Sequence, residues 1–267
     1  MFENTYLITD KLTTFSEADV EAAEVQLGTR FPEGYREYMT RLGVGEYCGY
    51  INVYPPQMIA RDQVGAKPPL EEFCHSWNGQ EFGLSAERIA DSIPIANSTD
   101  GHWVIFEVGI PDAIYVLPRD EQVVVKAGTT LMDALTWLYE PEGSPRFRYF
   151  NSEIDQQHVP IPRNLALSYE DLRDWLLGLN RHDHVEETSK LNEASGNMTY
   201  ALSVGGKVQI AQPGDEKHLM AFFKCFSGYV MCYTDLFQRL NIQIAHDPTT
   251  NDGTLQLISE FLQSKSA

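Results

Sequence analysis

The sequence has few basic side chains for its length. Of its 267 residues, 20 are Lys or Arg and 38 are Asp or Glu, which gives a formal net charge of −18. Proteins that bind nucleic acid contact the phosphates through clustered Lys and Arg side chains. The charge balance therefore predicts no nucleic-acid partner. It favours a basic protein partner, which it would attract at long range and less strongly in salt.

The sequence also lacks long apolar runs and a secretory signal. Its first residues, MFENTYLITDKL, show no basic start followed by an apolar stretch. A membrane-spanning helix requires about 18 or more consecutive apolar residues, and the sequence contains no such run. We therefore expect a cytoplasmic protein without a membrane partner.

Cysteine is scarce, and known catalytic motifs are missing. The four cysteines, Cys48, Cys74, Cys225 and Cys232, include no CxxC pair and lack the dense spacing of a disulfide scaffold, so we expect reduced thiols. There is no Gly-x-Ser-x-Gly sequence, and no cysteine lies in a known nucleophile motif. The sequence predicts no enzyme and no cofactor.

Enough apolar residues are present for two folded domains. Hydrophobic residues make up 43% of the chain and aromatic residues 11%, and the length favours two domains. A Pro- and Gly-rich stretch lies at 140–164, so we predict one α+β domain at 1–145 and a smaller α+β unit at 146–267. Residues 1–150 hold 23 acidic and 11 basic side chains, a net charge of −12, against −6 for the remainder.

Two helices are predicted near the N-terminus. Ser16 and Asp19 have the spacing of an N-cap and an acidic third helical residue, and Gly28 follows the last apolar position of that helix. A second helix is predicted to begin at Pro32 and to end at a left-handed Gly43. Beyond it, YINVYPP has the composition of a strand.

Short extended runs then predict an antiparallel meander, followed by a helix capped by Thr129. The runs are Ile93 to Ile95, Trp103 to Val108, Ala113 to Leu117 and Val123 to Lys126. The expected fold of the first domain is α+β, with an antiparallel or mixed sheet flanked by helices.

The second unit is predicted to contain three helices and a hairpin around Gly205-Gly206. The first helix begins at Ser168, and the last runs from about Leu255 to Leu262. The apolar residues assigned to the middle helix are Leu219, Phe222, Phe223 and Phe226.

Three groups of residues resemble chemical sites but have simpler explanations. Gly43 and Gly45 follow a helix, whereas the glycines of a dinucleotide site follow a strand, so they fit a helix cap and a tight turn better.

The sequence RHDHVEE contains His182 and His184, which form a weak metal-site candidate; the alternative is a solvated helix end. The acidic side chains spaced along the first helix fit a hydrated face better than an acid–base pair. They are Glu17, Glu21 and Glu24.

Tyrosines interleaved with acidic residues suggest a protein-binding surface. An aromatic ring buries a large area at low entropic cost, and a carboxylate can meet Lys or Arg of a partner. Alternating Tyr50 and Tyr54 also fit an ordinary core. The candidate contact residues are Glu46, Tyr47, Tyr50, Tyr54, Asp100, His102 and Trp103.

The order of segments resembles the SUKH superfamily, which includes yeast regulators of cell-wall synthesis and many bacterial immunity proteins. The similarity lies in SEADVEAAEVQLGTRFPEGYREYMTRLGVG and in SIPIANSTDGHWVIFEV through DAIYVLPRD, and covers about residues 10–140. The family's hairpin often carries an acidic residue after its glycine, whereas His102 and Trp103 follow Gly101 here.

This resemblance implies an α+β fold and a binding activity. It implies an immunity protein that neutralises a toxin domain, often a nuclease, and the negative charge suits the basic cleft of a nuclease. We therefore expect a basic toxin domain as the partner. Two alternatives stay open: an interaction scaffold in cell-wall or stress regulation, and a metal-dependent hydrolase centred on His182 and His184.

Overall fold

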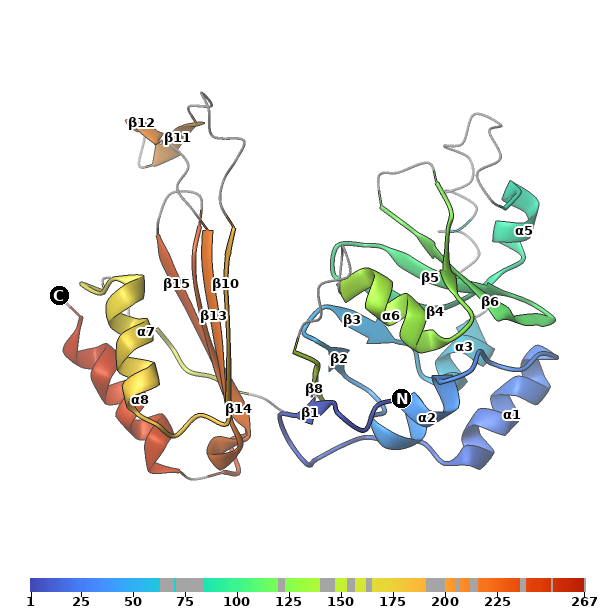
Figure 1. Ribbon diagram of the computed structural model, residues 1–267, viewed down its shortest axis with the longest axis horizontal. Coiled ribbons are helices and arrows are strands. Elements are labelled where there is room, and N and C mark those ends of the chain that lie inside the picture. The colour runs from blue at the N-terminus through green and yellow to red at the C-terminus, as the bar shows by residue number, and fades with distance from the viewer. Residues whose placement is uncertain are drawn as a thin grey trace. The chain divides into compact units, whose positions relative to one another are not determined.

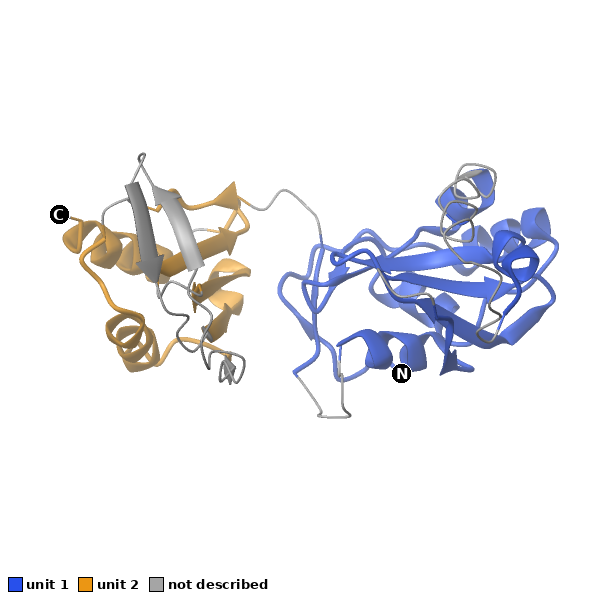
Figure 2. Ribbon diagram, turned by 90° about the horizontal axis from the view of Figure 1, so that it is seen from above, with its two compact units in different colours: residues 1–154 blue, residues 155–267 orange. Residues whose placement is uncertain are grey.

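The protein, described by a computed structural model, forms two compact units, residues 1–154 and 155–267 (Figure 2). Residues 149–151 pair within the sheet of the first unit, although the boundary expected after residue 145 would assign them to the second. That each unit is an independent domain stays a prediction. The structure describes residues 1–62, 70, 84–119, 123–139, 147–152, 157–161, 165–190, 200–204, 207–211, 216–235, 239–250 and 252–266.

Helix α1 (Glu17–Leu27) begins and ends as the sequence predicts. The Asp19 amide donates to Ser16 Oγ at 3.2 Å, and the Ser16 amide donates to the Asp19 carboxylate at 2.8 Å. This reciprocal pair satisfies two amides that would otherwise lack a partner at the helix start. Gly28 ends the helix with φ 66°, in the left-handed region that glycine adopts at low cost.

The described strands of the first unit form one mixed sheet, in the order β1-β8-β2-β3-β4-β5-β6-β7 (Figure 1). The first pair is parallel and the other neighbours are antiparallel, which confirms the predicted α+β fold. The strands are β1 (Tyr6–Leu7), β2 (Glu46–Tyr47), β3 (Ile51–Val53), β4 (Ile93–Ser98), β5 (Trp103–Glu107), β6 (Ile110–Leu117), β7 (Val125–Gly128) and β8 (Tyr149–Asn151).

Helices cover this sheet by packing their apolar stripes against it. Helix α1 lies against α2 and α3, α3 reaches β4, and α6 lies against β6 and β7 (Figure 1). None of the described helices is long and apolar enough to cross a membrane. The further helices of this unit are α2 (Tyr35–Arg41), α3 (Pro56–Asp62), α5 (Ala86–Ala90) and α6 (Leu131–Tyr139).

The cap of α6 differs from the prediction by one residue. The Asp133 amide donates to Thr130 Oγ1 at 3.2 Å, so Thr130 supplies the hydroxyl that was expected from Thr129. The Asp133 carboxylate in turn accepts from the amides of Thr129 and Thr130, each at 2.9 Å. These bonds lower the pKa of Asp133 despite its partial desolvation.

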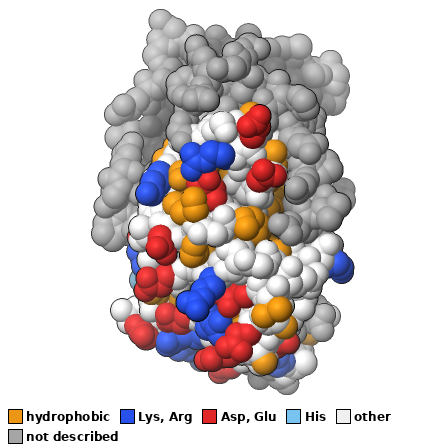
Figure 3. Space-filling view, turned by 90° about the vertical axis from the view of Figure 1, so that its right-hand side faces the viewer, with side chains coloured by type: hydrophobic (Ala, Val, Ile, Leu, Met, Phe, Trp, Pro, Cys, Tyr) orange, Lys and Arg blue, Asp and Glu red, His pale blue; other side chains and the backbone are white. Residues whose placement is uncertain are grey.

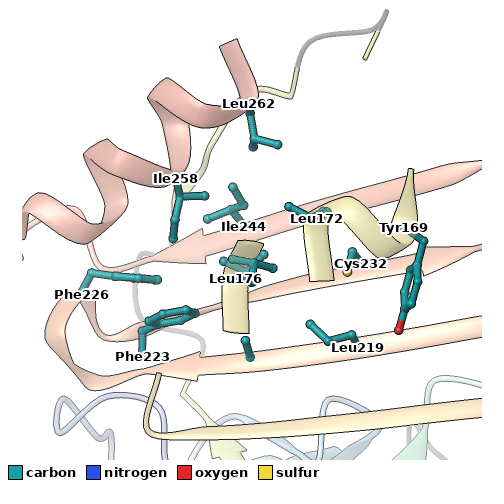
Figure 4. Close-up of a cluster of buried hydrophobic side chains, with 12 residues drawn as sticks. Tyr169, Leu172, Leu176, Leu219, Phe223, Phe226, Cys232, Ile244, Ile258 and Leu262 are labelled. Atoms are coloured by element: carbon teal, nitrogen blue, oxygen red, sulfur yellow. The ribbon is translucent and has the colours of Figure 1, made fainter. Parts of the chain in front are cut away.

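The second unit packs two helices against an antiparallel sheet whose strands follow the order β10-β13-β14-β15-β9. Side chains from α7, α8 and the sheet form one buried cluster (Figure 4), in which Leu172, Phe223 and Ile258 are fully buried. The elements are β9 (Gln157–His158), α7 (Tyr169–Gly178), β10 (His184–Lys190), β13 (Glu216–Phe223), the 3-10 turn η3 (Lys224–Phe226), β14 (Gly228–Thr234), β15 (Leu240–His246) and α8 (Gly253–Ser264).

Two sequence predictions for this unit have different outcomes. The middle helix is wrong, because Leu219, Phe222 and Phe223 lie in strand β13 and Phe226 lies in η3. Both faces of β13 are buried, and apolar residues on both faces imitate helical spacing. The hairpin is confirmed by antiparallel strands β11 (Tyr200–Val204) and β12 (Lys207–Ala211), although Gly205 and Gly206 themselves lie outside the described residues.

Two left-handed glycines provide a matched test of the packing behind α2. Gly28 has φ 66° and Gly43 has φ 77°. A Cβ on Gly28 would meet nothing within 4 Å, whereas a Cβ on Gly43 would lie 2.0 Å from the carbonyl oxygen of Thr13. We expect Gly28→Ala to lower the free energy of unfolding by about 1 kcal/mol, from backbone strain alone. Gly43→Ala should cost about 3 kcal/mol or more, because the clash adds to the strain.

Urea unfolding of both variants, followed by circular dichroism, measures this difference. Equal losses for Gly28→Ala and Gly43→Ala would show that the close approach of Gly43 to Thr13 is absent from the protein in solution.

Candidate functional site

The antiparallel register sorts the residues of β2, β3 and β4 onto two faces of the first unit's sheet. Successive side chains of a strand point to opposite faces, and paired residues share a face. Tyr47 is paired with Ile51, and Ile51 with Ser98; all three are buried on the helix-covered side. Glu46 and Asn52 are also paired, so they lie on the opposite side, here called the outer face.

The outer face carries a row of half-buried side chains across five strands, four of them polar and the fifth a tryptophan. Asn151 is paired with Glu46, Glu46 with Asn52, Asn52 with Asn97, and Asn97 with Trp103. We call these five residues the cross-strand row. Among the described residues, the side-chain amides of Asn52 and Asn97 make no hydrogen bond. Their donors and acceptors therefore remain available to water or to a bound molecule.

Tyrosine side chains flank the cross-strand row along β3. Tyr54 directly follows β3, and its ring lies beside that of Trp103, whereas Tyr50 lies in the turn before β3, where its hydroxyl contacts Asp100 and Ser98; both tyrosines are half-buried. The rings of Tyr54 and Trp103 are 6.4 Å apart at 72°, an edge-to-face arrangement that is favourable for aromatic pairs. The outer face thus combines amides with aromatic rings, as protein-binding surfaces commonly do.

Two neighbouring turns are tied together at one end of the row. The Tyr50 hydroxyl donates to the Asp100 carboxylate at 2.9 Å, and the Thr99 amide donates to the Tyr50 carbonyl at 2.9 Å. Arg119 also donates to the backbone carbonyl of Asp100 at 3.3 Å. These bonds hold the exposed Asp100 carboxylate in one place beside the row, which lowers the ordering cost of binding a partner.

Two of the seven candidate contact residues point away from this face. Tyr47 is 1% exposed, and its ring lies 6.2 Å from that of Phe2, so it belongs to the core and cannot touch a partner. His102 precedes Trp103 and points to the other face, where its ring lies 6.5 Å from Trp137 of α6. Glu46, Tyr54 and Trp103 lie on the outer face, and Tyr50 and Asp100 lie together in the turns beside it.

Burial raises the pKa of both Tyr50 and Tyr54. Desolvation raises the pKa of Tyr54 to about 12. Desolvation is the largest cause of the raised pKa of Tyr50; the hydrogen bond with Ser98 lowers this pKa, and the adjacent Asp100 carboxylate raises it. Both hydroxyls are therefore neutral hydrogen-bonding groups at neutral pH.

The His182 and His184 pair does not assemble a metal centre with other described residues. Desolvation and the neighbouring His182 lower the pKa of His184, which begins β10 with its ring 6.1 Å from Phe222. No group of three or more His, Cys, Asp or Glu side chains within the described ranges has the arrangement to hold a metal. Cys48, Cys225 and Cys232 form no disulfide bond among the described residues, and Cys74 lies outside them.

The acidic side chains along α1 form ion pairs with an arginine of α2. Arg36 lies 3.1 Å from Glu21 and 3.0 Å from Glu24, and 3.8 Å from the more distant Glu17. Glu24 also accepts from the Phe31 amide at 2.9 Å. These contacts give the acidic side chains a role in joining α1 to α2, which explains their helical spacing without an acid–base pair.

The amides of the cross-strand row were not among the candidates from sequence. Asn52 lies midway between Tyr50 and Tyr54, so period-two alternation around the two tyrosines would have identified it. Asn97 and Asn151 come from distant parts of the chain. They join the row only through strand pairing, for which the sequence offers no local signal.

Comparison with known proteins supports the family resemblance. Residues 14–136 match the model of the SMI1 / KNR4 family (SUKH-1), a range that begins just before α1 and ends within α6. Neither the curated proteins nor the solved structures gave a match. The family match confirms the resemblance predicted from the helix pair and the hairpin, and it lies within the first unit.

The raised pKa of Tyr54 predicts a specific loss of stability at alkaline pH. An unfolded tyrosine ionises near pH 10, whereas Tyr54 in the fold holds its proton to about pH 12. Its contribution is thus complete below about pH 10 and is lost as the pH rises through 12. Tyr54→Phe cannot ionise, so its free energy of unfolding should fall less steeply over this range than that of the wild type.

Urea unfolding at a series of alkaline pH values provides the comparison, with the difference between the two proteins at pH 8 as the baseline. Parallel curves for the wild type and Tyr54→Phe would contradict the burial of the Tyr54 hydroxyl.

Proposed function

The first unit belongs to the SUKH superfamily, and from this premise we propose that the protein is a cytoplasmic immunity protein. It acts without catalysis by binding and neutralising a toxin domain. Family membership is consistent with an immunity-protein-like or related function. The single observation that carries the proposal further is the outer face, where aromatic rings lie beside a fixed carboxylate and beside amides that make no hydrogen bond within the described part of the chain.

The charge of the protein indicates the chemistry of the partner. The net charge is −18, and residues 1–150 contribute −12 of it. Such a field accelerates the approach of a basic protein and repels acidic ones. A nuclease toxin fits this requirement because its cleft is basic in order to hold phosphates.

The outer face supplies short-range contacts that charge alone does not give. The rings of Tyr54 and Trp103 are half-buried, and Trp103 packs against a buried cluster that includes Leu117, so each ring offers only its exposed part to a partner. The amides of Asn52 and Asn97 offer paired donors and acceptors. Carboxylates stand on either side of these groups, with Glu46 in the row and Asp100 at its end. We infer that a basic partner buries its apolar contacts on the rings while its cations meet these two carboxylates.

Coexpression with the toxin domain encoded beside this gene tests the proposal in cells. Wild-type protein should restore growth, and Asp100→Lys should weaken affinity by about tenfold, the usual size for a well-placed interface charge. Asp174→Lys is a matched control, because it makes the same charge change on an exposed side chain of α7 in the second unit. The affinities are measured by calorimetry at low and high salt.

Growth that is not restored with any neighbouring toxin would overturn the proposal. Equal weakening by Asp100→Lys and Asp174→Lys would remove the outer face as the contact surface. Recovery of several partners and no toxin in a pull-down would favour the alternative of an interaction scaffold.

A further inference from the structure

A second surface of the first unit exposes apolar side chains at the opposite end of β5. Val25 on α1 is 82% exposed, and Val108, in the turn after β5, and Ile110, the first residue of β6, are each 46% exposed. Strand β5 runs from Trp103 to Glu107. At roughly 3.3 Å per residue, its two ends are about 13 Å apart, so the exposed apolar residues lie about that far from Trp103. Figure 3 looks onto this end of the unit and shows hydrophobic side chains among charged ones.

The exposed residues form one surface because α1 and the turn are joined. The Gly109 amide donates to Thr29 Oγ1 at 3.0 Å, directly after the end of α1. Between them lies a shallow groove of about 660 Å³, lined by Glu21, Glu24, Val25, Gly28, Thr29, Arg30, Gly109 and Pro111. We call this the hairpin groove. Single exposed valines are common on protein surfaces, whereas large contiguous apolar patches are typical of interaction sites.

Val25 lies on the side of α1 that faces away from the core. The helix buries Val20, Ala23 and Leu27, and Val25 is about half a turn from that stripe at 100° per residue. Packing within the unit therefore does not explain this valine.

The charge around the groove favours a basic occupant. Glu21 is one turn before Val25, and its side chain is 63% exposed. Helix α1 carries Glu17, Asp19, Glu21 and Glu24 and has no basic residue. Arg36 contacts three of these carboxylates and Arg30 also lines the groove, so the four carboxylates exceed these two cations by two charges. A second copy of the chain would bring this acidic helix against an equally acidic surface, which disfavours self-association.

We propose that the hairpin groove docks a Lys- or Arg-bearing segment of a partner protein. The aliphatic stem of the cation lies on Val25 and Pro111, and its charged end meets Glu21. Long basic side chains commonly bury their stems in this way while the charge stays near water. An apolar residue beside the cation packs on Ile110, which gives the surface a preference for segments that alternate basic and apolar residues.

This inference goes beyond the proposed function, because it concerns another end of the unit and does not require a toxin. Both surfaces lie in the electrostatic field of the same net negative charge, but they present different side chains to a partner. The outer face offers amides and aromatic rings, whereas the hairpin groove offers aliphatic side chains and one exposed carboxylate. One partner could therefore bind at each end of β5 at the same time.

Titration of the full-length, isotope-labelled chain with designed peptides tests the groove. The probe is an amphipathic Lys/Leu peptide, with one control in which Ser replaces Leu and another in which Glu replaces Lys. We expect the Lys/Leu peptide to shift the amide resonances of Val25, Thr29 and Gly109. The double variant Val25→Ser/Ile110→Ser should bind it about tenfold more weakly, because two apolar contacts are lost.

Two single variants complete the test. Glu21→Gln should weaken binding and reduce its salt dependence. Leu257→Ser is the matched control, because this leucine of α8 is 40% exposed in the second unit and lies outside the groove. All four substitutions are at exposed side chains, so unfolding curves should remain close to those of the wild type.

Three results would overturn the proposal. The first is equal binding of the Lys/Leu and Lys/Ser peptides, since the apolar side chains of the hairpin groove would then not contribute to binding. The second is resonance shifts confined to the outer face, at Asn97 and Trp103. The third is a dimer in sedimentation velocity that Val25→Ser/Ile110→Ser abolishes, since a second copy would then occupy the groove. Failure of toxin rescue leaves these outcomes unaffected.

Discussion

The strand register across β2, β3, β4 and β5 is the constraint on which the first unit depends. Because side chains alternate between faces, a slip by one residue would exchange the buried Tyr47 with the polar Glu46. The turn between β2 and β3 fixes this register. Cys48 and Gly49 both adopt positive φ, 56° and 62°, the left-handed pair that tight hairpins favour. The same register that buries the core therefore also assembles the cross-strand row on the opposite face.

Local signals in the sequence were sufficient where the structure is determined by neighbouring residues. The capping bonds of Ser16 with Asp19 and the left-handed Gly28 are contacts within a few residues, and the sequence predicts both. Strand β13 shows the limit of such signals. Leu219 and Phe223 face the helices, while Phe222 is buried on the other side, so the apolar pattern matches a helix as well as a strand. Only pairing with β10 and β14 distinguishes the two.

The candidate site was predictable only in part, for the same physical reason. Composition identified Tyr50, Tyr54 and Trp103 as aromatic candidates, and the rings of Tyr54 and Trp103 do lie together. Composition could not separate Tyr47 from them, because burial depends on the face and not on the residue type. The bond between Tyr50 and Asp100 joins residues 50 positions apart. It forms because the turn before β3 and the turn after β4 meet at the same end of these two strands, which requires the register of β3 with β4.

Charge and local geometry have different roles in this protein. The net charge of −18 acts over about 8–10 Å in physiological salt, so it guides basic partners to the whole unit rather than to one surface. Selection among those partners must therefore come from contacts of a few ångströms. The cross-strand row and the hairpin groove lie about 13 Å apart, at the two ends of β5, and present different groups. A sheet that is rigid between them allows each surface to change in sequence without altering the other, while both keep the same electrostatic attraction.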